Sequence, residues 1–463
     1  MPQRTNSLET FLARLGPAFG DRLRTDAEAL SLVAGDESDL PPGSPAAALW
    51  PESSDEVVLI AREAGDLGVP LVPRGAGTGK AGGCIPASGE VVVDLSRMNR
   101  ILELRPQDLY AEVEPGVITR DLDLAAGEVG FFYPPDPASL ESCTIGGNIA
   151  TNAGGSRAVK YGVTHRYAWG VELVLSGGTV MRLGRRSIKG VAGLDLRALV
   201  VGSEGTLGFV TRATMHIVPA PEAVETAWLT FDDALTASRA AEKIFAAGFL
   251  PRMMELLDAR SLEAVRPVSP MALPERGGAA ILLEVDGAEE EAPEELLRIA
   301  ALAVDAGAVE SAIAKNEKER EAMRRTRRLV SSSLKEKFPF KISDDIAVPR
   351  SRMPELLERA REEGEAAGLV VSAYGHLGDG NVHVNLLCAT QEERQTARAV
   401  RRRILAIAVD MGGTVSGEHG IGMAKRDQLL LELSEDVVDL QRRLKRVFDP
   451  TGIMNPGKVY PPA

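Results

Sequence analysis

Cysteine is scarce in this sequence, and its scarcity narrows the kinds of site that the chain can hold. Only three cysteines occur in 463 residues, Cys84, Cys143 and Cys388, and no pair has CxxC spacing. A disulfide framework, a cysteine zinc site and an Fe–S cluster held by this chain are therefore not expected. The low cysteine count fits a reducing compartment.

Long apolar runs and a basic charge balance are also missing. No apolar run approaches the ~20 residues needed to span a bilayer, and residues 1–7 lack the apolar core of a signal peptide. The formal net charge is -13, which disfavours nucleic acid as a partner because phosphate binding requires a basic face. We therefore expect a cytoplasmic protein, with peripheral attachment to the inner membrane face through a partner left open. A chain of this length predicts two or three domains.

Histidine is rare as well, but its placement is informative. The five histidines are His165, His216, His376, His383 and His419. Three of them lie in two glycine-rich segments, GHLGDGNVH (residues 375–383) and SGEHG (residues 416–420), the second of which also carries Glu418. Two histidines and one carboxylate form a known ligand set for a catalytic divalent metal. Our first hypothesis is that His376, His383 and Glu418 bind a metal and that His419 transfers a proton. The alternative is that both segments are ordinary turns. We expect His165 and His216 to be structural or solvated.

Three other glycine-rich segments precede these histidines. The first, PRGAGTGKAGG (residues 73–83), contains five glycines after a predicted strand. The second spans residues 133–155 and contains two Gly-Gly pairs, and the third is GSEGTLG (residues 202–208). Glycine lets backbone N–H groups approach a ligand closely, and concave arrays of N–H groups bind phosphate and pyrophosphate. The first segment matches neither a Walker A loop nor a Rossmann fingerprint, so irregular loops remain the alternative.

The pattern changes near residue 221, where a proline-rich break follows a strand. Beyond it, predicted strands alternate with amphipathic helices, which is typical of a separate α+β domain. An arginine-rich helix over residues 317–328 carries mostly solvated charges, although one or two of its arginines are candidates to hold a carboxylate. Lys341, at the start of a later strand, is a second candidate cation.

Taken together and in order, these motifs resemble the FAD-linked oxidases of the vanillyl-alcohol oxidase/PCMH flavoprotein superfamily, from about residue 45 to residue 460. The resemblance is strongest to the group containing the glycolate oxidase catalytic subunit and FAD-dependent D-lactate dehydrogenase. It implies an α+β fold with a two-subdomain PCMH-type FAD-binding domain (residues 1–220). It further implies an α+β cap domain with an antiparallel sheet and the metal site (residues 221–425), and a C-terminal segment that returns to the FAD domain (residues 426–463).

The resemblance also implies which residues contact FAD. The expected cofactor-binding residues are Arg74, Gly75, Ala76, Gly77, Thr78, Gly79, Pro135, Asp136, Thr144, Gly147, Asn148, Asn152, Gly154, Gly155, Glu204, Gly205 and Asn455. Some relatives attach the flavin through a histidine, but residues 74–79 contain neither histidine nor cysteine. Because Cys84 and Cys143 are the only nearby candidates, we expect non-covalent FAD.

In metal-dependent relatives, the residues matching His376, His383 and Glu418 are ligands, and the residue matching His419 is the base. The arginine that holds the substrate carboxylate aligns best with Arg327, with Arg328 as a fallback and Lys341 further along. The implied reaction oxidises a D-2-hydroxy acid, D-lactate or glycolate, to the 2-oxo acid by hydride transfer to FAD N5. Zinc, manganese and iron all suit such ligands. Electrons would pass to an external acceptor: an Fe–S subunit, a cytochrome, a quinone or an electron-transfer flavoprotein. A homodimer is compatible with the sequence.

Three further functions are compatible with the same motifs. One is that of a D-2-hydroxyglutarate dehydrogenase, for which the arginine run at 324–328 would supply a cation for the distal carboxylate. Another is that of a non-redox flavoenzyme similar to alkyl-glycerone-phosphate synthase. The last is that of a non-catalytic subunit that merely binds FAD.

Overall fold

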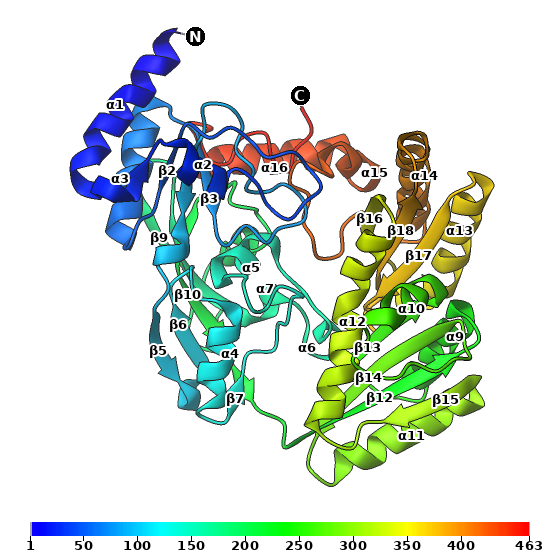
Figure 1. Cartoon of the computed structure of the whole chain (residues 1–463). Helices are drawn as coiled ribbons and strands as arrows, with labels where there is room; N and C mark the ends of the chain where they lie inside the picture. Colours follow the sequence, from blue (N-terminus) through cyan, green and yellow to red (C-terminus); the bar gives the residue numbers. More distant parts are fainter. Residues whose placement is uncertain (1, 463) are drawn as a thin grey trace. The chain divides into compact units, whose positions relative to one another are not determined.

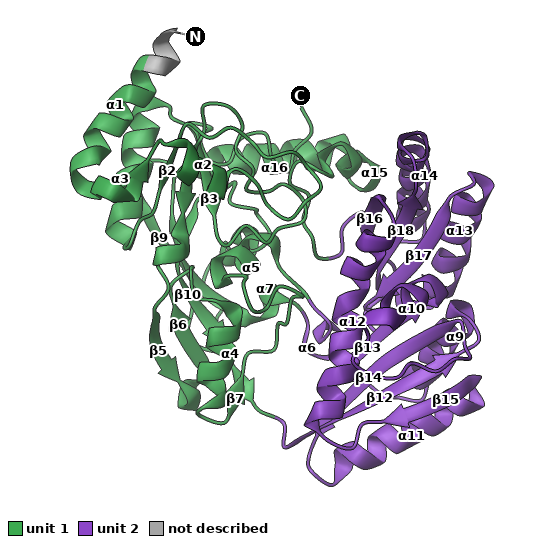
Figure 2. Ribbon diagram, in the orientation of Figure 1, with its two compact units in different colours: residues 1–154, 163–220, 418–463 green, residues 155–162, 221–417 purple. Residues whose placement is uncertain are grey.

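The chain folds into two compact units (Figure 2). The computed structural model describes residues 2–462, with side chains from residue 6 onward. Unit 1 comprises residues 1–154, 163–220 and 418–463, and unit 2 comprises residues 155–162 and 221–417. Two short segments differ from the expected domain boundaries: residues 155–162 belong to unit 2, and residues 418–425 belong to unit 1. Both assignments depend on tertiary hydrogen bonds, which no local pattern reveals.

The first sheet of unit 1, which contains the strands labelled β2 and β3 in Figure 1, is mostly parallel. Its strand order is β1 (Leu23–Arg24), β2 (Ala47–Leu49), β4 (Val91–Asp94) and β3 (Leu71–Arg74), and only the β1–β2 pair is antiparallel. All four residues of β4 are buried, as expected for a strand covered on both faces. Helices α1 (Pro2–Phe19) and α3 (Ser54–Leu67) bury apolar side chains in the same core as the sheet. The Ser53 side chain caps α3, and Gly68 ends it at φ 67°.

The C-terminal segment completes this sheet. After α16 (Glu435–Phe448), the backbone runs alongside β3, where Leu71 N–H donates to Ile453 O at 2.8 Å and Asn455 N–H donates to Leu71 O at 2.7 Å. These bonds satisfy the edge of β3, which would otherwise expose unpaired backbone groups. Upstream of α16, the N–H groups of Met423 and Ala424 both donate to Ala81 O, which holds residues 418–425 in unit 1.

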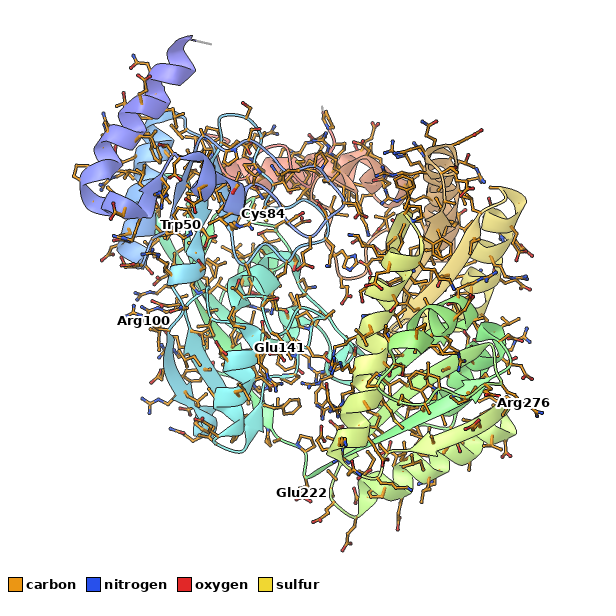
Figure 3. All side chains as sticks on the ribbon, viewed as in Figure 1. Trp50, Cys84, Arg100, Glu141, Glu222 and Arg276 are labelled. Carbon is orange, nitrogen blue, oxygen red and sulfur yellow. The ribbon has the colours of Figure 1, made fainter. Side chains whose placement is uncertain are left out.

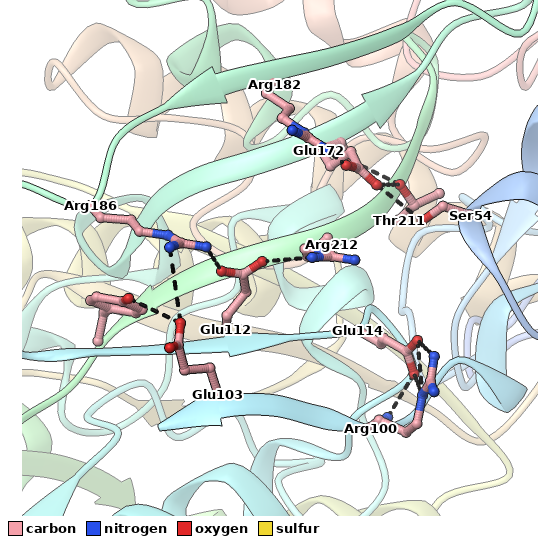
Figure 4. A network of polar contacts seen from close by, with 11 residues as sticks. Ser54, Arg100, Glu103, Glu112, Glu114, Glu172, Arg182, Arg186, Thr211 and Arg212 are labelled. Atoms are coloured by element: carbon pink, nitrogen blue, oxygen red, sulfur yellow. Dashed lines mark hydrogen bonds and ion pairs between the residues drawn. The ribbon is translucent and has the colours of Figure 1, made fainter. Parts of the chain in front are cut away.

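The second sheet of unit 1 is antiparallel and carries a network of charges. Its strand order is β5 (Ile101–Arg105), β6 (Tyr110–Val113), β10 (Phe209–His216), β8 (Ala168–Val174) and β9 (Val180–Gly184). Glu112 and Glu172 are buried carboxylates on this sheet, and each has cationic or hydroxyl partners (Figure 4). Arg212 donates to Glu112 at 3.0 Å, and Thr211 donates to Glu172 at 3.1 Å. This pairing offsets the cost of removing the carboxylates from water.

Unit 2 is built on one seven-stranded sheet in which every neighbouring pair is antiparallel. Its strand order is β15 (Ala308–Ile313), β12 (Ala223–Phe231), β14 (Ala279–Gly287), β13 (Met253–Asp258), β17 (Val370–Gly375), β18 (Asn381–Cys388) and β16 (Phe340–Ala347). The expected α+β class, with an antiparallel sheet in the second domain, is therefore confirmed.

Helices cover this sheet, and one of them, α12, carries Arg327. The helices are α9 (Ala234–Ala246), α10 (Ala259–Val265), α11 (Glu291–Asp305), α12 (Glu317–Lys337), α13 (Met353–Ala366) and α14 (Gln391–Asp410). Helices α10 and α12 share an apolar core with Trp228, Leu257 and Tyr374 of the sheet. Since alternate residues of a strand face the same side, Glu255 faces α12 together with Leu257.

Residues 155–162 are tied to β14 of unit 2. Tyr161 Oη donates to Asp286 Oδ2 at 2.6 Å, and Lys160 also pairs with Asp286. These contacts explain why a segment from the first half of the chain belongs to the second unit.

Among the described residues, no helix combines the length and apolarity that crossing a bilayer requires.

Candidate functional site

Unit 1 contains a cavity of about 420 Å³ lined by its glycine-rich segments. The first segment needs glycine for space. A Cβ on Gly75 would lie 2.5 Å from Thr144 Oγ1, and Gly77 has φ 72° with a Cβ position 2.1 Å from the Arg74 guanidinium. Both values are far below van der Waals contact, so the loop can pass this close to its neighbours only without side chains at these positions. Glycine at these two positions therefore lets the loop pack closely against its neighbours along the cavity.

Most of the expected cofactor-binding residues line this cavity. Those that do so are Arg74, Gly75, Ala76, Gly77, Thr78, Gly79, Thr144, Gly147, Asn148, Gly154, Glu204 and Gly205. The cavity lining does not include Pro135, Asp136, Asn152, Gly155 or Asn455. Ser139, Ser142 and Ser203 also line the cavity and lie within the expected glycine-rich segments, whereas sequence reasoning missed Asp36 and Glu37. Polar residues of this kind carry no distinctive spacing, so only the assembled cavity identifies them.

Arg74 is held by the protein itself. Its guanidinium donates to Gly35 O at 2.7 Å and to Cys84 Sγ at 3.3 Å, and its Nε lies 3.6 Å from Asp94 Oδ2. The residue is only 8% exposed. Its positive charge is thus largely committed to fixing the base of the glycine-rich loop.

Cys84, labelled in Figure 3, is one of the two cysteines considered for covalent flavin attachment. It is among the residues that line the cavity. Burial raises the pKa of its thiol to about 11. Since the thiolate is the nucleophilic form, a thiol with this pKa is poorly suited to forming a covalent bond near neutral pH. Cys143 is buried beside Thr119, whose Oγ1 lies 3.2 Å from its sulfur.

Glu204 connects two glycine-rich segments. Its buried carboxylate accepts hydrogen bonds from the backbone N–H groups of Ile421 at 2.7 Å and Gly422 at 2.8 Å. Burial raises the pKa of Glu204 to about 7 despite these donors. Glu204 also has φ 52°, an uncommon conformation for a residue other than glycine. It therefore holds in place the loop that follows Glu418 and His419.

Asn455 has a similar role on the other side of this loop. Its Nδ2 donates to Gly83 O at 2.9 Å and to Glu204 O at 2.7 Å. It joins the C-terminal segment to the first and third glycine-rich segments. Its expected place in the cofactor site is thus indirect, since it fixes segments that line the cavity.

Glu418 and His419 also line the cavity in unit 1. His419 Nε2 lies 4.0 Å from Glu418 Oε1, and the His419 side chain is 26% exposed. A histidine that lines a cavity can exchange a proton with a molecule bound there.

In unit 2, the other two histidines of interest are neighbours. His376 follows β17 and His383 lies on β18, and their ring centroids are 5.5 Å apart. The tight turn between the strands brings them together, and it requires Gly380, which has φ 86° and whose Cβ would lie 2.1 Å from Val348 O. Both histidines are buried, at 7% and 8% exposure. The segment can therefore form a tight turn and still supply two metal ligands, so the two interpretations of its sequence are compatible.

A buried carboxylate that sequence reasoning missed contacts His376. Glu255 Oε1 lies 2.5 Å from His376 Nδ1, and Glu255 Oε2 accepts from Arg327 Nε at 2.7 Å. Burial alone would raise the pKa of Glu255, but the adjacent His376 and Arg327 outweigh it and lower the pKa to about 2. Glu255 stands within an ordinary apolar strand pattern, so no local signal marks it.

Tyr374 lies among two cations and a histidine. The Arg327 guanidinium carbon is 5.0 Å and the Lys341 Nζ is 5.9 Å from its ring centroid, and the His383 ring is 5.3 Å away. Lys341 Nζ also donates to Ser331 Oγ at 2.9 Å. The expected pair Arg327 and Lys341 is thus brought together in unit 2, near the two histidines. Two cations beside a tyrosine and imidazoles make a suitable surface for a small carboxylate.

Two other arginines of the run, Arg324 and Arg328, have other partners. Arg324 Nε donates to Glu284 Oε1 at 2.6 Å, and Arg324 Nη1 donates to Glu317 Oε1 at 3.0 Å. Arg328, the fallback for the substrate contact, pairs with Glu321 on the surface, where both side chains are 50% exposed. The helix periodicity therefore directs Arg327, and not Arg328, toward the sheet.

The two remaining histidines, His165 and His216, have the structural settings that we expected. His216 stacks on Trp169 with ring centroids 4.1 Å apart, and its Nδ1 is 2.8 Å from Leu109 O. Burial lowers its pKa. His165 is an exposed residue of the short helix α7 (Thr164–Tyr167), and its backbone N–H donates to Asn152 Oδ1 at 2.8 Å.

Comparison with known protein families gives two matches that cover most of the chain. Residues 45–184 match the FAD binding domain, and residues 220–459 match the C-terminal domain of FAD linked oxidases. The first family model covers the glycine-rich segment at residues 73–83, and the second covers both histidine segments.

Several known proteins are similar over almost their whole length. The glycolate oxidase subunit GlcD of Bacillus subtilis (strain 168) is 38% identical over 90% of this chain and 89% of its own length. The D-lactate dehydrogenase of Archaeoglobus fulgidus is 35% identical over 88% and 90% of the two chains. The D-2-hydroxyglutarate dehydrogenase of Stutzerimonas stutzeri (strain A1501) is 32% identical over 95% and 96%.

Solved structures share the fold at lower identity. p-Cresol methylhydroxylase with substrate bound has a TM-score of 0.80 at 17% identity, covering 99% of this chain and 97% of that chain. Alkyldihydroxyacetonephosphate synthase has a TM-score of 0.75 at 20% identity, covering 97% and 84%. These likenesses confirm the PCMH-type fold expected from the sequence, and at such identities they carry the fold alone.

Proposed function

This chain belongs to the FAD-linked oxidase family, and on that premise we propose that it oxidises a D-2-hydroxy acid, D-lactate or glycolate, to the 2-oxo acid. The observation that carries the proposal is a pair of cations beside a tyrosine in unit 2, which we propose as a carboxylate-binding surface. There Arg327 and Lys341 flank Tyr374, and His383 lies against the same ring. The similar proteins named for glycolate oxidation and D-lactate dehydrogenation agree with this substrate class.

The residues of unit 1 fit FAD. The cavity is lined by the glycine-rich segments, whose residue type suits phosphate binding through backbone N–H groups, and added Cβ atoms at Gly75 and Gly77 would collide with neighbouring groups. FAD, when bound, supplies the two-electron acceptor for the C2 hydride of the substrate. Binding without a covalent bond is supported by the protonated Cys84 thiol and by the absence of histidine and cysteine from residues 74–79.

The donor set also fits a divalent metal held by His376, His383 and Glu418. The two imidazoles are buried and adjacent in unit 2. Glu418, which belongs to unit 1, supplies the carboxylate of the donor set. Zinc, manganese and iron all accept nitrogen and oxygen ligands of this kind. Such an ion, when bound, lowers the pKa of a coordinated hydroxyl group.

The chain's own residues then have distinct tasks. Arg327 and Lys341 hold the substrate carboxylate, and the planar guanidinium of Arg327 fixes its orientation. His419, which lines the cavity in unit 1, removes the hydroxyl proton as a general base. Glu204 and Asn455 keep the loop of His419 in position through their backbone contacts.

D-2-hydroxyglutarate, as a substrate, requires a further cation for its second carboxylate. Arg324, the nearest candidate on the same helix face, already pairs with Glu284 and Glu317. This pairing favours a monocarboxylate, although the similar D-2-hydroxyglutarate dehydrogenase keeps the dicarboxylate open to test. The carboxylate-binding surface and the candidate base argue against a non-redox flavoenzyme and against a subunit that merely binds FAD.

One substrate panel separates these candidates. The FAD-loaded protein is mixed anaerobically with glycolate, D-lactate, L-lactate or D-2-hydroxyglutarate, and flavin absorbance is followed by stopped flow. We expect rapid bleaching with D-lactate or glycolate and little with L-lactate. Faster bleaching with D-2-hydroxyglutarate would favour the dehydrogenase specific for that dicarboxylate, and no bleaching with any acid would contradict the proposal.

Reoxidation of the flavin requires a partner, which we propose to be external to this chain. The sequence has too few cysteines for an Fe–S cluster of its own. An Fe–S subunit, a cytochrome, a quinone and an electron-transfer flavoprotein are the candidate acceptors. The similar protein of Bacillus subtilis is named as a subunit, which agrees with an acceptor on another chain. Cytoplasmic location, with or without peripheral attachment to the membrane, is part of the same proposal.

A further inference from the structure

Glu255 is a completely buried carboxylate in unit 2 that contacts both His376 and Arg327. It lies on β13 with 0% exposure. One oxygen is 2.5 Å from His376 Nδ1, and the other accepts from Arg327 Nε at 2.7 Å. A single side chain therefore contacts a candidate metal ligand and the candidate substrate-binding arginine at once.

We propose that Glu255 is a positioning residue that orients the His376 imidazole for metal binding and the Arg327 guanidinium for the substrate carboxylate. The inference rests on the proposed function, because that function assigns metal binding to His376 and substrate binding to Arg327. An imidazole whose Nδ1–H donates to a carboxylate has its Nε2 lone pair available for a metal. An arginine held through Nε keeps its two terminal amino groups for a second carboxylate.

The free-energy cost of burying Glu255 supports a specific role for this carboxylate. Moving a carboxylate from water into a buried position is unfavourable, and a buried ion pair often adds little to stability over an apolar replacement. Glu255 is a buried carboxylate whose neighbours on the strand, Leu256 and Leu257, are apolar. Its presence there is therefore not explained by stability alone. Orienting two groups simultaneously provides that reason, since each bond uses a different oxygen.

The same unit offers a matched control. Glu284 on β14 is also buried, at 1% exposure, and it accepts from Nε of an arginine on α12, Arg324, at 2.6 Å. The same carboxylate also accepts from the Thr226 hydroxyl at 3.0 Å. Glu284 thus reproduces the buried carboxylate–arginine pair of Glu255, with a threonine hydroxyl as its second donor where Glu255 has a histidine.

The test compares Glu255→Gln with Glu284→Gln in the FAD-loaded protein. Glutamine has nearly the same shape, but its amide nitrogen is a donor and cannot accept from a second donor. We expect Glu255→Gln to weaken Zn²⁺ or Mn²⁺ binding 10–100-fold, the range found for partners of metal-bound histidines, as measured by competition with a chelator. The KM for the hydroxy acid should rise as well. Glu284→Gln should lower the melting temperature to a similar extent while leaving metal affinity within about twofold of the wild type.

Equal metal affinity in Glu255→Gln and the wild type would overturn the inference, as would an equal loss in Glu284→Gln. A second measurement does not depend on metal or on activity. In metal-free protein labelled with ¹⁵N-histidine, His376 should be protonated at Nδ1 and not at Nε2, with its signal assigned through His376→Gln. The opposite tautomer would contradict the role of Glu255. If the wild type shows the expected tautomer but binds no divalent metal, the proposed function fails at its metal site while the contact stands.

Discussion

Glu204 Oε2 accepts a hydrogen bond of 2.8 Å from the backbone N–H of Gly422. The neighbouring oxygen accepts from Ile421, so one buried side chain holds two successive peptide groups. Gly420 permits this approach, because it has φ 79° and a Cβ there would lie 3.0 Å from the Glu204 carboxyl carbon. The third glycine-rich segment thereby fixes the loop that carries His419.

This contact predicts a dependence of stability on pH. The pKa of Glu204 is about 7 in the folded protein, compared with 4.5 for an ordinary glutamate. Below about pH 4.5 the group is protonated in both states. Between about pH 4.5 and 7 the unfolded chain releases this proton while the folded chain keeps it, so the contribution of Glu204 to stability falls as pH rises. The loss is complete above pH 7 and is on the order of 3 kcal/mol, because a tenfold change in proton affinity corresponds to about 1.4 kcal/mol.

Glu204→Gln removes the titrating group and should flatten this part of the pH profile. The measurement is the melting temperature of the FAD-loaded protein between pH 4.5 and 7.5. Glu141→Gln serves as a control, since Glu141 has a 79% exposed side chain and should leave the wild-type profile unchanged. An unchanged slope in Glu204→Gln would rule out this carboxylate as its source.

Replacing His419 tests the proposed base. His419→Ala should retain FAD while flavin reduction by D-lactate or glycolate slows by at least about 100-fold, the lower end of general-base contributions. Anaerobic stopped-flow absorbance measures the rate. In the control His165→Ala, which replaces an exposed residue of helix α7, the flavin should be reduced at the normal rate. A rate for His419→Ala within a factor of two of the wild type would remove His419 from the mechanism.

Exchanging arginine for lysine distinguishes Arg327 from its neighbour on the helix. Arg327→Lys keeps the charge but loses the planar guanidinium, which can donate to Glu255 and to the substrate at the same time. KM should therefore rise by roughly tenfold, equivalent to about 1.4 kcal/mol. Arg328→Lys changes only a surface pair with Glu321 and should leave KM unaltered. Steady-state kinetics with an artificial electron acceptor provides both values. A larger effect at Arg328 would move the substrate contact to the fallback position.

Adding a methyl group in the first glycine-rich loop tests the FAD cavity. In Gly75→Ala the new Cβ would lie 2.5 Å from Thr144 Oγ1, so the loop must shift and FAD retention should fall sharply. The ratio of flavin to protein absorbance after gel filtration measures retention. Gly16→Ala in α1 meets no atom within 4 Å and should hold FAD as the wild type does. It should also gain about 0.5–1 kcal/mol of stability, because alanine favours the helix. Full FAD retention in Gly75→Ala would argue against this loop as the binding site.

The arginine run illustrates where sequence reasoning reached its limit. Five arginines in residues 320–328 have similar local surroundings, and periodicity alone allows several of them to face inward. The structure separates them by partner: Arg324 meets Glu284, Arg327 meets Glu255, and Arg328 stays at the surface. The partners of the two inward-facing arginines lie on strands 40 to 72 positions away in the chain, so no local pattern could identify them.

The sequence by itself determined the family, the glycine-rich segments and the small set of histidines, because each depends on residue types that few other environments require. Glycine is needed wherever backbone passes another atom at less than contact distance, as at Gly75 and Gly380. Only the tertiary structure decided which charged groups act together. Glu204 and Glu255 are ordinary residues in their own segments, and their roles arise from burial against donors that the chain brings from far away. The physical reason is that a carboxylate removed from water must find partners, and folding alone determines which ones it meets.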